Sequence, residues 1–275
     1  MKRFWLAAVL CMICTLPGLA FAGDNPWDRK LPFESATLHY ALSGTQAGTE
    51  DKYIRDYGRE MATYRKATTV MMGMKMINDT IEIQDSNWMY SYDMKEKTGT
   101  KMTNPQKFMI EEYNKLTAAE KKQVQKNAEA MGTSVMKGMN GKMEQNVTKI
   151  LGYSCDRTSV MGSTIYMLHG SPIPLKTETN MAGMKMASVA TSFKEGEAEA
   201  RFFEHPAGIE AVYNQESDEM SKNMAVQMMT MLKDPDAAKK MSESHSAESG
   251  QGGGAQDNKK MMDQAGQMMK GILGN

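Results

Sequence analysis

The feature that most constrains the fold is the alternation of apolar and polar residues in two separate blocks of the chain. In the segment 33–44, FESATLHYALSG, apolar residues occupy every second position from Ala36 to Leu42. Side chains in a β-strand alternate between two faces, so this period predicts strands with one buried face. Similar short runs, separated by turn residues, continue over residues 33–104 and return over residues 149–193. They favour an antiparallel sheet.

The residues between these two blocks have helical patterns instead. Asn104 is suited to cap a helix whose first residue is Pro105. Residues Thr117–Glu120 match a capping box, in which a Thr and a Glu three positions later satisfy each other's backbone donors. The apolar stripe predicted for the second helix consists of Val124, Ala128, Met131 and Val135.

A methionine-rich helix is predicted after the second block of strands. Ser217 is suited to cap it, and Asp234-Pro235 to stop it. Its apolar stripe, which we expect to pack against the sheet, consists of Met220, Met224, Met228, Met231 and Leu232. The order of strands, helices, strands and helix predicts the α+β class, not alternating βαβ units.

The first 22 residues predict a cleaved secretory signal peptide. Lys2 and Arg3 precede an apolar run, and Ala20-Phe21-Ala22 supplies the small residues that a signal peptidase requires. The run is too short to span a bilayer, which takes about 20 apolar residues. Neither Cys11 nor Cys14 follows a small residue, so a lipoprotein signal is not expected. We therefore expect an exported, soluble protein.

The rest of the chain divides by composition. Residues 23–233 are predicted to form one globular domain that includes the methionine-rich helix. Residues 234–257 contain almost no large apolar side chain and include a Gly-rich run. Such a segment buries too little surface to offset its ordering entropy, so we expect a disordered linker. Residues 258–275 are expected to form a short amphipathic helix or tail.

Composition and motifs exclude several functions. Basic and acidic residues are balanced at 33 each, which gives no electrostatic case for binding nucleic acid. The catalytic and phosphate-binding motifs GxSxG, HExxH and GxGxxG are absent, and the four histidines are scattered. Cys155 is the single cysteine after the signal peptide; we interpret it as a strand residue, with a reactive thiol as the alternative. We expect no enzyme activity and no cofactor.

Four segments together resemble a known family of periplasmic proteins. They are residues 83–105 around NWMYSYD, the strand GYSCD at 152–156, and residues 171–193 and 202–213. Over about residues 31–213, the chain resembles the lipoprotein-localisation (LolA/LolB-like) superfamily, and more closely uncharacterised Gram-negative periplasmic domains of that fold.

This resemblance implies a fold, a location and a kind of ligand. The fold would be a strongly curved antiparallel half-barrel with helices on its concave side, and the location the periplasm. In characterised relatives the concave side holds lipid acyl chains. The lack of a lipoprotein signal makes the chain more similar to the soluble carrier than to the lipidated receptor. No functional residue of the family is matched to a position here.

The chain has 30 methionines, which are densest in two similar runs, MMGMKMIN from position 71 and MAGMKMASVA from position 181. In strands, Met72, Met74 and Met76 would share one face, as would Met184 and Met186, with Lys75 and Lys185 on the opposite face. Methionine is a routine core residue, but such rows also suit a flexible apolar lining that repacks around different ligands. The predicted ligand-binding residues are Met72, Met74, Met76, Trp88, Tyr90, Tyr92, Met184 and Met186.

Two alternative functions remain open at this point. Thioethers are soft ligands for Cu(I), so Met181, Met184 and Met186 are the alternative metal ligands. The methionine-rich C-terminal helices are the other alternative, as a docking surface for a protein partner or a membrane. The leading hypothesis is a periplasmic carrier of a lipid-like or amphiphilic ligand.

Overall fold

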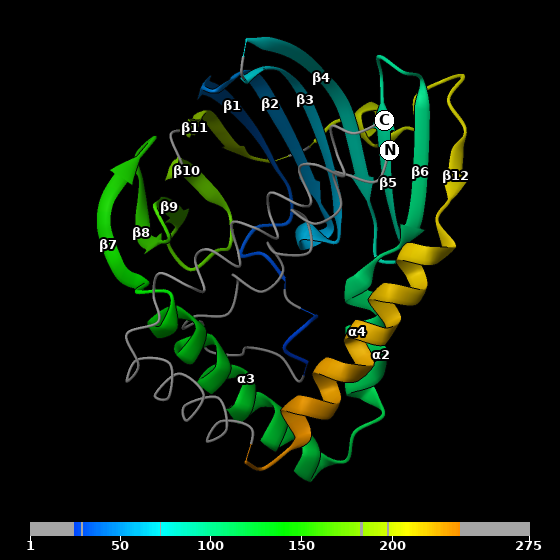
Figure 1. The fold of residues 1–275 in the computed structure, drawn as a ribbon, viewed down its shortest axis with the longest axis vertical. Coiled ribbons are helices and arrows are strands. Elements are labelled where there is room, and N and C mark those ends of the chain that lie inside the picture. Colours follow the sequence, from blue (N-terminus) through cyan, green and yellow to red (C-terminus); the bar gives the residue numbers. More distant parts are fainter. Residues whose placement is uncertain (1–24, 29, 72, 182–183, 197, 237–275) are drawn as a thin grey trace.

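The computed structural model describes residues 25–28, 30–71, 73–181, 184–196 and 198–236. Twelve strands form one sheet in the order β12-β6-β5-β4-β3-β2-β1-β11-β10-β9-β8-β7, and every pair is antiparallel except β12 with β6. Figure 1 shows the strands in the upper part of the view and helices α2, α3 and α4 below them. The predicted α+β class and the mainly antiparallel sheet are therefore confirmed.

The strands and helices have the following bounds. The strands are β1 Ala36–Gly44, β2 Gln46–Arg55, β3 Glu60–Met71, β4 Met74–Gln84, β5 Trp88–Asp93, β6 Thr98–Thr103, β7 Lys142–Ile150, β8 Tyr153–Val160, β9 Ser163–Leu168, β10 Pro174–Met181, β11 Met184–Glu195 and β12 Ala211–Tyr213. The helices are α2 Pro105–Asn114, α3 Ala118–Gly138 and α4 Gln215–Lys233, with short 3₁₀ turns η1 Asp56–Gly58 and η2 Ala200–Phe203.

Both faces of the sheet carry buried side chains. Ile54 lies opposite Ala36 of β1, while its neighbour Tyr53 lies opposite Thr37. Successive strand residues point to opposite faces, so Ile54 and Tyr53 belong to different clusters. Ile54 packs with Leu38, Tyr40, Leu175 and Phe193, among others, in the first cluster. Tyr53 packs with Ala62, Ile81, Ile83, Tyr92 and Ala198 in the second cluster.

Helices α2 and α3 begin where the sequence predicts. The Asn104 side chain accepts a hydrogen bond from the Gln106 N–H, and Pro105 is the first helical residue. Glu120 accepts from the Thr117 N–H at 2.8 Å, and the Thr117 hydroxyl accepts from the Glu120 N–H, which is the predicted capping box. The α3 stripe is buried as expected at Val124, Ala128 and Met131. The side chain of Val135 is not among those that the structure describes.

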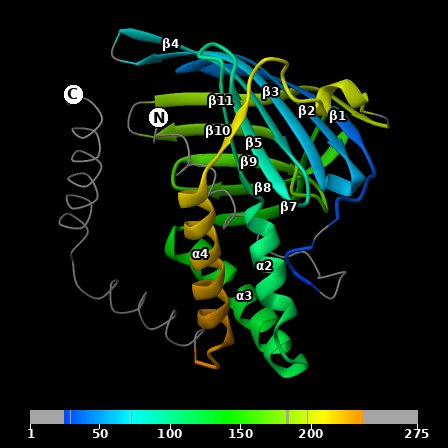
Figure 2. The ribbon, with the colours of Figure 1, turned by 90° about the vertical axis from the view of Figure 1, so that its right-hand side faces the viewer.

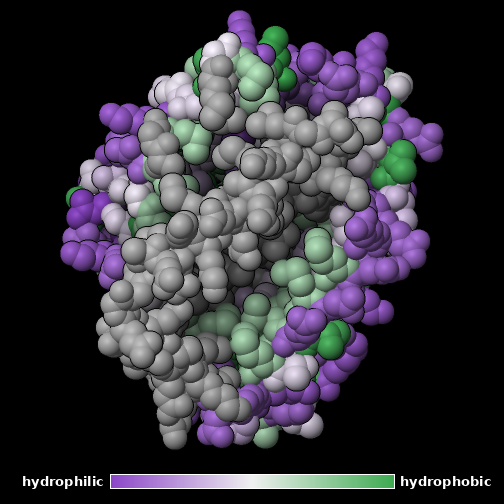
Figure 3. Space-filling view, in the orientation of Figure 1, coloured by the Kyte–Doolittle hydropathy of each residue, from purple (hydrophilic) through white to green (hydrophobic). Residues whose placement is uncertain are grey.

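Helix α4 differs from the prediction in its cap and in its buried face. It begins at Gln215, and Asn214 caps it by accepting from the Ser217 N–H. Its apolar residues are buried against α2 and α3, not against the sheet: Met229 and Leu232 pack with Tyr113, Val124, Ala128 and Met131. The predicted stripe residues Met220, Met224 and Met231 are exposed instead. Figure 3 shows pale green apolar surface over the region of α4.

Two polar side chains fix α4 in place. The buried amide of Asn127 in α3 donates to the carbonyl oxygens of Leu232 at 2.8 Å and Asp234 at 2.7 Å, where α4 ends. The Asp218 carboxylate accepts from the Thr103 N–H at 2.7 Å, from the Thr103 hydroxyl and from the Tyr213 hydroxyl at 2.7 Å. These bonds join the first turn of α4 to β6 and β12.

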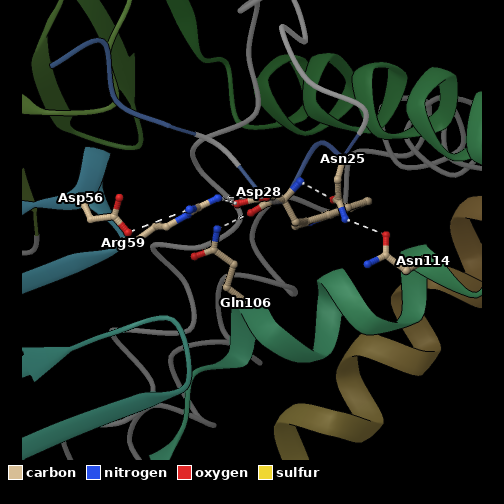
Figure 4. A network of polar contacts seen from close by, with 7 residues as sticks. Asn25, Asp28, Asp56, Arg59, Gln106 and Asn114 are labelled. Atoms are coloured by element: carbon tan, nitrogen blue, oxygen red, sulfur yellow. Dashed lines mark hydrogen bonds and ion pairs between the residues drawn. The ribbon is translucent and has the colours of Figure 1, made fainter. Parts of the chain in front are cut away.

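A polar network attaches the first described residues to the body of the protein (Figure 4). Arg59, after η1, donates to Asp28 at 3.2 Å and lies 3.9 Å from Asp56. Asn25 donates to the Asn114 side chain at 3.4 Å, at the end of α2. Gln106, in the first turn of α2, donates to the Trp27 carbonyl oxygen. Nothing in the sequence pattern indicates this network, because its members are distant along the chain.

Strand β7 begins at Lys142, earlier than the predicted return of strands at residue 149. The predicted signal peptide at 1–22 lies outside the described residues, as do Gly23, Asp24 and most of the predicted linker and tail. Among the helices of the described part of the chain, none combines the length and the apolar character needed to cross a bilayer.

Candidate ligand-binding surface

The two methionine runs form the ends of two β-hairpins. Met71 lies opposite Met74 where β3 turns into β4, and Met181 lies opposite Met184 where β10 turns into β11. Met72, which the sequence places between Met71 and Met74, lies outside the described residues. The period of two that the sequence shows is therefore a strand period, as predicted.

The two hairpins present methionines to the same face of the sheet. Residues directly opposite each other in neighbouring strands share a face. Met76 lies opposite Thr69, and Thr69 lies opposite Gln46 of β2. Gln46 and Gly44 flank the turn residue Thr45, one on each strand of the hairpin. Gly44 in turn lies opposite Met186 of β11. Met76 and Met186 therefore belong to one cross-strand row and point to one face.

Four strand spacings separate the two methionines of this row. The strands between β4 and β11 are β3, β2 and β1. At about 4.8 Å per strand, Met76 and Met186 are roughly 19 Å apart along the sheet. Met74 and Met184 extend the same face by one residue pair at each hairpin. The shared face is therefore an extended surface, with a methionine group at each end.

Thr45 links the two hairpins through its backbone. Its N–H donates to the Lys185 carbonyl oxygen at 2.7 Å, and its own carbonyl oxygen accepts from the Val70 N–H at 3.0 Å. The adjacent Gly44 has a φ of +91°, and a Cβ there would lie 2.0 Å from the Lys185 carbonyl oxygen. Only glycine combines this backbone conformation with so close an approach.

The methionine side chains of this face are accessible. Met74 is 53% exposed, Met76 44% and Met186 37%, whereas Met184 is half-buried. A hollow of about 370 Å³ adjoins the hairpin of β10 and β11, but it opens mainly on the opposite face, that of Lys185, because Ser43 and Glu178 both lie opposite Ala187 and Asn180 lies opposite Lys185. It is lined by Ser43, Gly44, Gly162, Thr164, Glu178, Thr179, Asn180, Lys185, Met186 and Ala187. The hollow is therefore separate from the methionine face.

The three predicted aromatic residues lie on the opposite face of the sheet. Tyr92 lies opposite Ile81 and Tyr90 opposite Ile83, at odd-numbered positions of β4 that point away from Met76. Trp88 shares their face because it is two residues from Tyr90 on the same strand. The predicted ligand-binding set therefore divides into two groups, and the sheet separates the aromatic group from the methionines.

A cluster that the sequence did not indicate covers two of these aromatic residues, Tyr90 and Tyr92. The Tyr92 hydroxyl lies 2.8 Å from His205 Nδ1, and the rings of Tyr90 and His205 are 4.3 Å apart between centroids. Phe202 stacks on Tyr53 at 3.7 Å. Burial is the main cause that raises the pKa of Tyr92 and of Tyr90. We assign this cluster a packing role, because its polar groups bond one another.

The alternative copper ligands are close together along one hairpin. Met181 and Met184 are directly opposite, and Met186 is two residues beyond Met184 on the same face. Thioethers from these three residues are the soft donors that Cu(I) prefers. Within the described ranges, His, Cys, Asp and Glu form no group of three or more that could hold a metal.

The remaining candidate groups are engaged in local contacts. Cys155 is fully buried in β8, and burial raises the pKa of its thiol. His39 Nδ1 lies 2.7 Å from Asp51, and His169 Nδ1 lies 2.8 Å from Asp156. Together with His205 against Tyr92, the histidines in the described part of the chain each have a different partner. His245 lies outside that part.

Comparison with known proteins gives no family for this chain. No family model matches it, and no curated protein matches it. An uncharacterised conserved protein from Thermus thermophilus is similar in structure, with a TM-score of 0.41 and 9% identity over 66% of this chain and 92% of that one. A structure of PNGF-II has a TM-score of 0.30 and 12% identity, over 71% of this chain and 33% of that one.

Proposed function

We propose that this protein is a periplasmic carrier of a lipid-like or amphiphilic ligand. The observation that supports this function best is the shared face of Met74, Met76, Met184 and Met186 on one continuous sheet. Flexible, polarizable thioether side chains adapt to ligands of different shape, as an acyl chain requires. Export by the predicted signal peptide is part of this proposal.

The proposal includes the shape of the binding site. In a half-barrel, the methionine face would be the concave side, with helices beside it, as the LolA/LolB-like resemblance of the sequence implies. Bending of the sheet would bring the two ends of the methionine row closer than their separation along a flat sheet. Trp88, Tyr90 and Tyr92 belong to the opposite face and are not part of the proposed site.

Native mass spectrometry of protein purified from its exported compartment tests this function. We expect an adduct of several hundred daltons that extracts into organic solvent. The variant Met76→Ser/Met186→Ser should retain about tenfold less of it for each methionine that contacts the ligand, since burying one such side chain contributes roughly 1.5 kcal/mol. The matched control is Met220→Ser/Met224→Ser, which changes two exposed methionines on α4. No adduct, or equal loss in both variants, would contradict the carrier function.

Cu(I) binding is a second candidate, supported by the pairing of Met181 with Met184 beside Met186. The variant Met184→Leu/Met186→Leu separates it from lipid binding, because leucine keeps the apolar surface and removes the sulfur. Loss of copper retained under reducing conditions, with the lipid adduct unchanged, would favour the metal function. Copper retention equal to that of the unchanged protein would exclude these two ligands.

Docking through α4 is a third candidate, since Met220, Met224 and Met231 are exposed along this helix. A truncation after Pro235 removes the tail and leaves α4 intact. Unchanged recovery of a partner by this truncated chain would assign docking to α4, whereas loss of recovery would assign it to the tail.

A further inference from the structure

Five β-hairpins of the sheet turn at the same end of the strands. The strands β1 and β2, β3 and β4, β5 and β6, β8 and β9, and β10 and β11 are consecutive antiparallel pairs. Their order in the sheet brings the five turns to one end of the strands. In Figure 2 the hairpins of β4 and of β10 with β11 extend toward the left of the view. We call this end of the sheet the hairpin edge.

Large apolar side chains are exposed along the hairpin edge. Six of them, between 44% and 57% exposed, are Val70, Met74, Met76, Ile77, Met161 and Met181. They come from three different hairpins, and Met186 lies beside them. Exposed apolar residues that gather in this way indicate a contact surface rather than scattered surface positions.

The β3–β4 hairpin exposes apolar side chains on both of its faces. Val70 lies opposite Lys75, and Ile77 lies opposite Thr68, so both point away from the face of Met74 and Met76. A single rigid protein surface covers one face of such a hairpin. Hydrocarbon surrounds an inserted hairpin on both faces, so this arrangement favours a lipid surface as the partner.

The charges of the hairpin edge favour the same partner. Residues 67–77 and 179–190 contain no acidic residue, and their charged residues are Lys75 and Lys185. Residues 158–165, around the turn between β8 and β9, contain no charged residue. The β5–β6 turn at the same end carries Asp93, Lys95, Glu96 and Lys97, whose charges balance. Among these hairpin turns, Lys75 and Lys185 are therefore the basic residues that no acidic residue of their own segment balances. Lysines beside inserted apolar groups extend to the headgroups and attract anionic lipids.

We propose that the hairpin edge is a membrane-contact surface that inserts its apolar side chains into the interface of an anionic lipid bilayer. Val70 and Ile77 on one face and Met74 and Met76 on the other enter the boundary between headgroups and acyl chains. Lys75 and Lys185 bind the lipid phosphates. This inference does not rest on the proposed carrier function, because contact with a bilayer requires no internal ligand.

Co-sedimentation of the full chain with lipid vesicles tests the proposal. One set contains phosphatidylcholine alone, and the other contains phosphatidylcholine with phosphatidylglycerol. We expect tighter binding to the second set. Lys75→Gln/Lys185→Gln should remove most of that preference, at about fivefold in affinity for each lysine near the surface. Equal binding to both sets, or binding to neither, would overturn the proposal.

A second pair of variants tests the apolar contact. Val70→Ser/Ile77→Ser should weaken vesicle binding at least about tenfold, because two inserted side chains become polar. The matched control is Val212→Ser/Val226→Ser, which changes two exposed valines on β12 and α4. Circular dichroism establishes that each variant is folded. Equal weakening in the control, or no weakening in the hairpin variant, would overturn the proposal.

The same variant distinguishes membrane contact from ligand carriage. Val70 and Ile77 point away from the methionine face, so the lipid adduct in native mass spectrometry should remain in Val70→Ser/Ile77→Ser. Lost vesicle binding with the adduct retained supports a separate membrane-contact surface. Loss of the adduct together with unchanged vesicle binding would overturn the assignment of these two side chains to the bilayer.

Discussion

Met76 and Met186 lie in one cross-strand row of the sheet and on the same face, with the side-chain-free Gly44 between them. The two methionine runs are similar in sequence and are the ends of similar hairpins. The turn at Thr45 joins them through hydrogen bonds to Lys185 and to Val70. The integrity of this turn therefore determines whether the methionine face is continuous.

Replacing Gly44 should destabilise the protein more than replacing another glycine with a similar backbone. Gly44→Ala combines a positive φ with a Cβ placed 2.0 Å from the Lys185 carbonyl oxygen. We expect a loss of about 3 kcal/mol in the free energy of unfolding. Gly73→Ala is the control: its φ is +77°, nothing lies within 4 Å of its Cβ, and about 1 kcal/mol is expected. Equal losses in urea unfolding would contradict the close approach at Gly44.

Asn127 should stabilise the protein by holding the C-terminal end of α4 against α3. Asn127→Ala leaves the buried Leu232 carbonyl oxygen without its side-chain donor. We expect a loss of about 2 kcal/mol, measured by urea unfolding. Asn127→Asp should cost more, because it places a carboxylate oxygen against two carbonyl oxygens. If the two variants were equally stable, the donated hydrogen bonds would not be the source of the effect.

Two substitutions in the hydrogen-bond network of Asp218 should lower the free energy of unfolding by different amounts. Tyr213→Phe removes one of the hydroxyl donors and should lower the free energy of unfolding only slightly, because the Thr103 donors remain. Asp218→Ala removes the acceptor shared by Thr103 and Tyr213, and a loss of about 3 kcal/mol is expected. The Asp218 hydrogen bond is also the main cause that raises the pKa of Tyr213. A loss in Tyr213→Phe as large as in Asp218→Ala would contradict this ordering.

Cys155 should react slowly with thiol reagents while the protein is folded. Its side chain is fully buried, and burial raises the pKa of the thiol. The raised pKa means that the folded state favours the neutral thiol. This contribution to stability is therefore present below about pH 8.5, the usual thiol pKa, and is lost as the pH rises through the folded-state value.

Labelling with an aromatic disulfide reagent measures this reactivity. The native protein at about pH 8, near the usual thiol pKa, should react far more slowly than the same protein in denaturant. Cys155→Ala should remove all labelling after the signal peptide is cleaved, and it should reduce the dependence of stability on pH in the alkaline range. Fast labelling of the native protein would contradict a buried, unreactive thiol.

The sequence by itself determined the features that depend on neighbouring residues. The alternation of apolar and polar residues around Ala36 and Leu38 specifies a strand, whatever position that strand has in the sheet. The capping box of Thr117 and Glu120 and the cap at Asn104 are complete within a few residues. The methionine runs were predicted as strands for the same reason.

Tertiary structure alone decided which elements meet and which face each one buries. Trp88, Tyr90 and Tyr92 share one face by local geometry, but only the pairing of β5 with β4 places that face away from Met76. In α4, Met220 and Met229 are the same residue type, so their hydrophobicity does not distinguish them. The packing of α4 on α2 and α3 buries Met229 and leaves Met220 exposed. Periodicity fixes the angle between side chains on one element, whereas contacts between distant segments fix the orientation of that element.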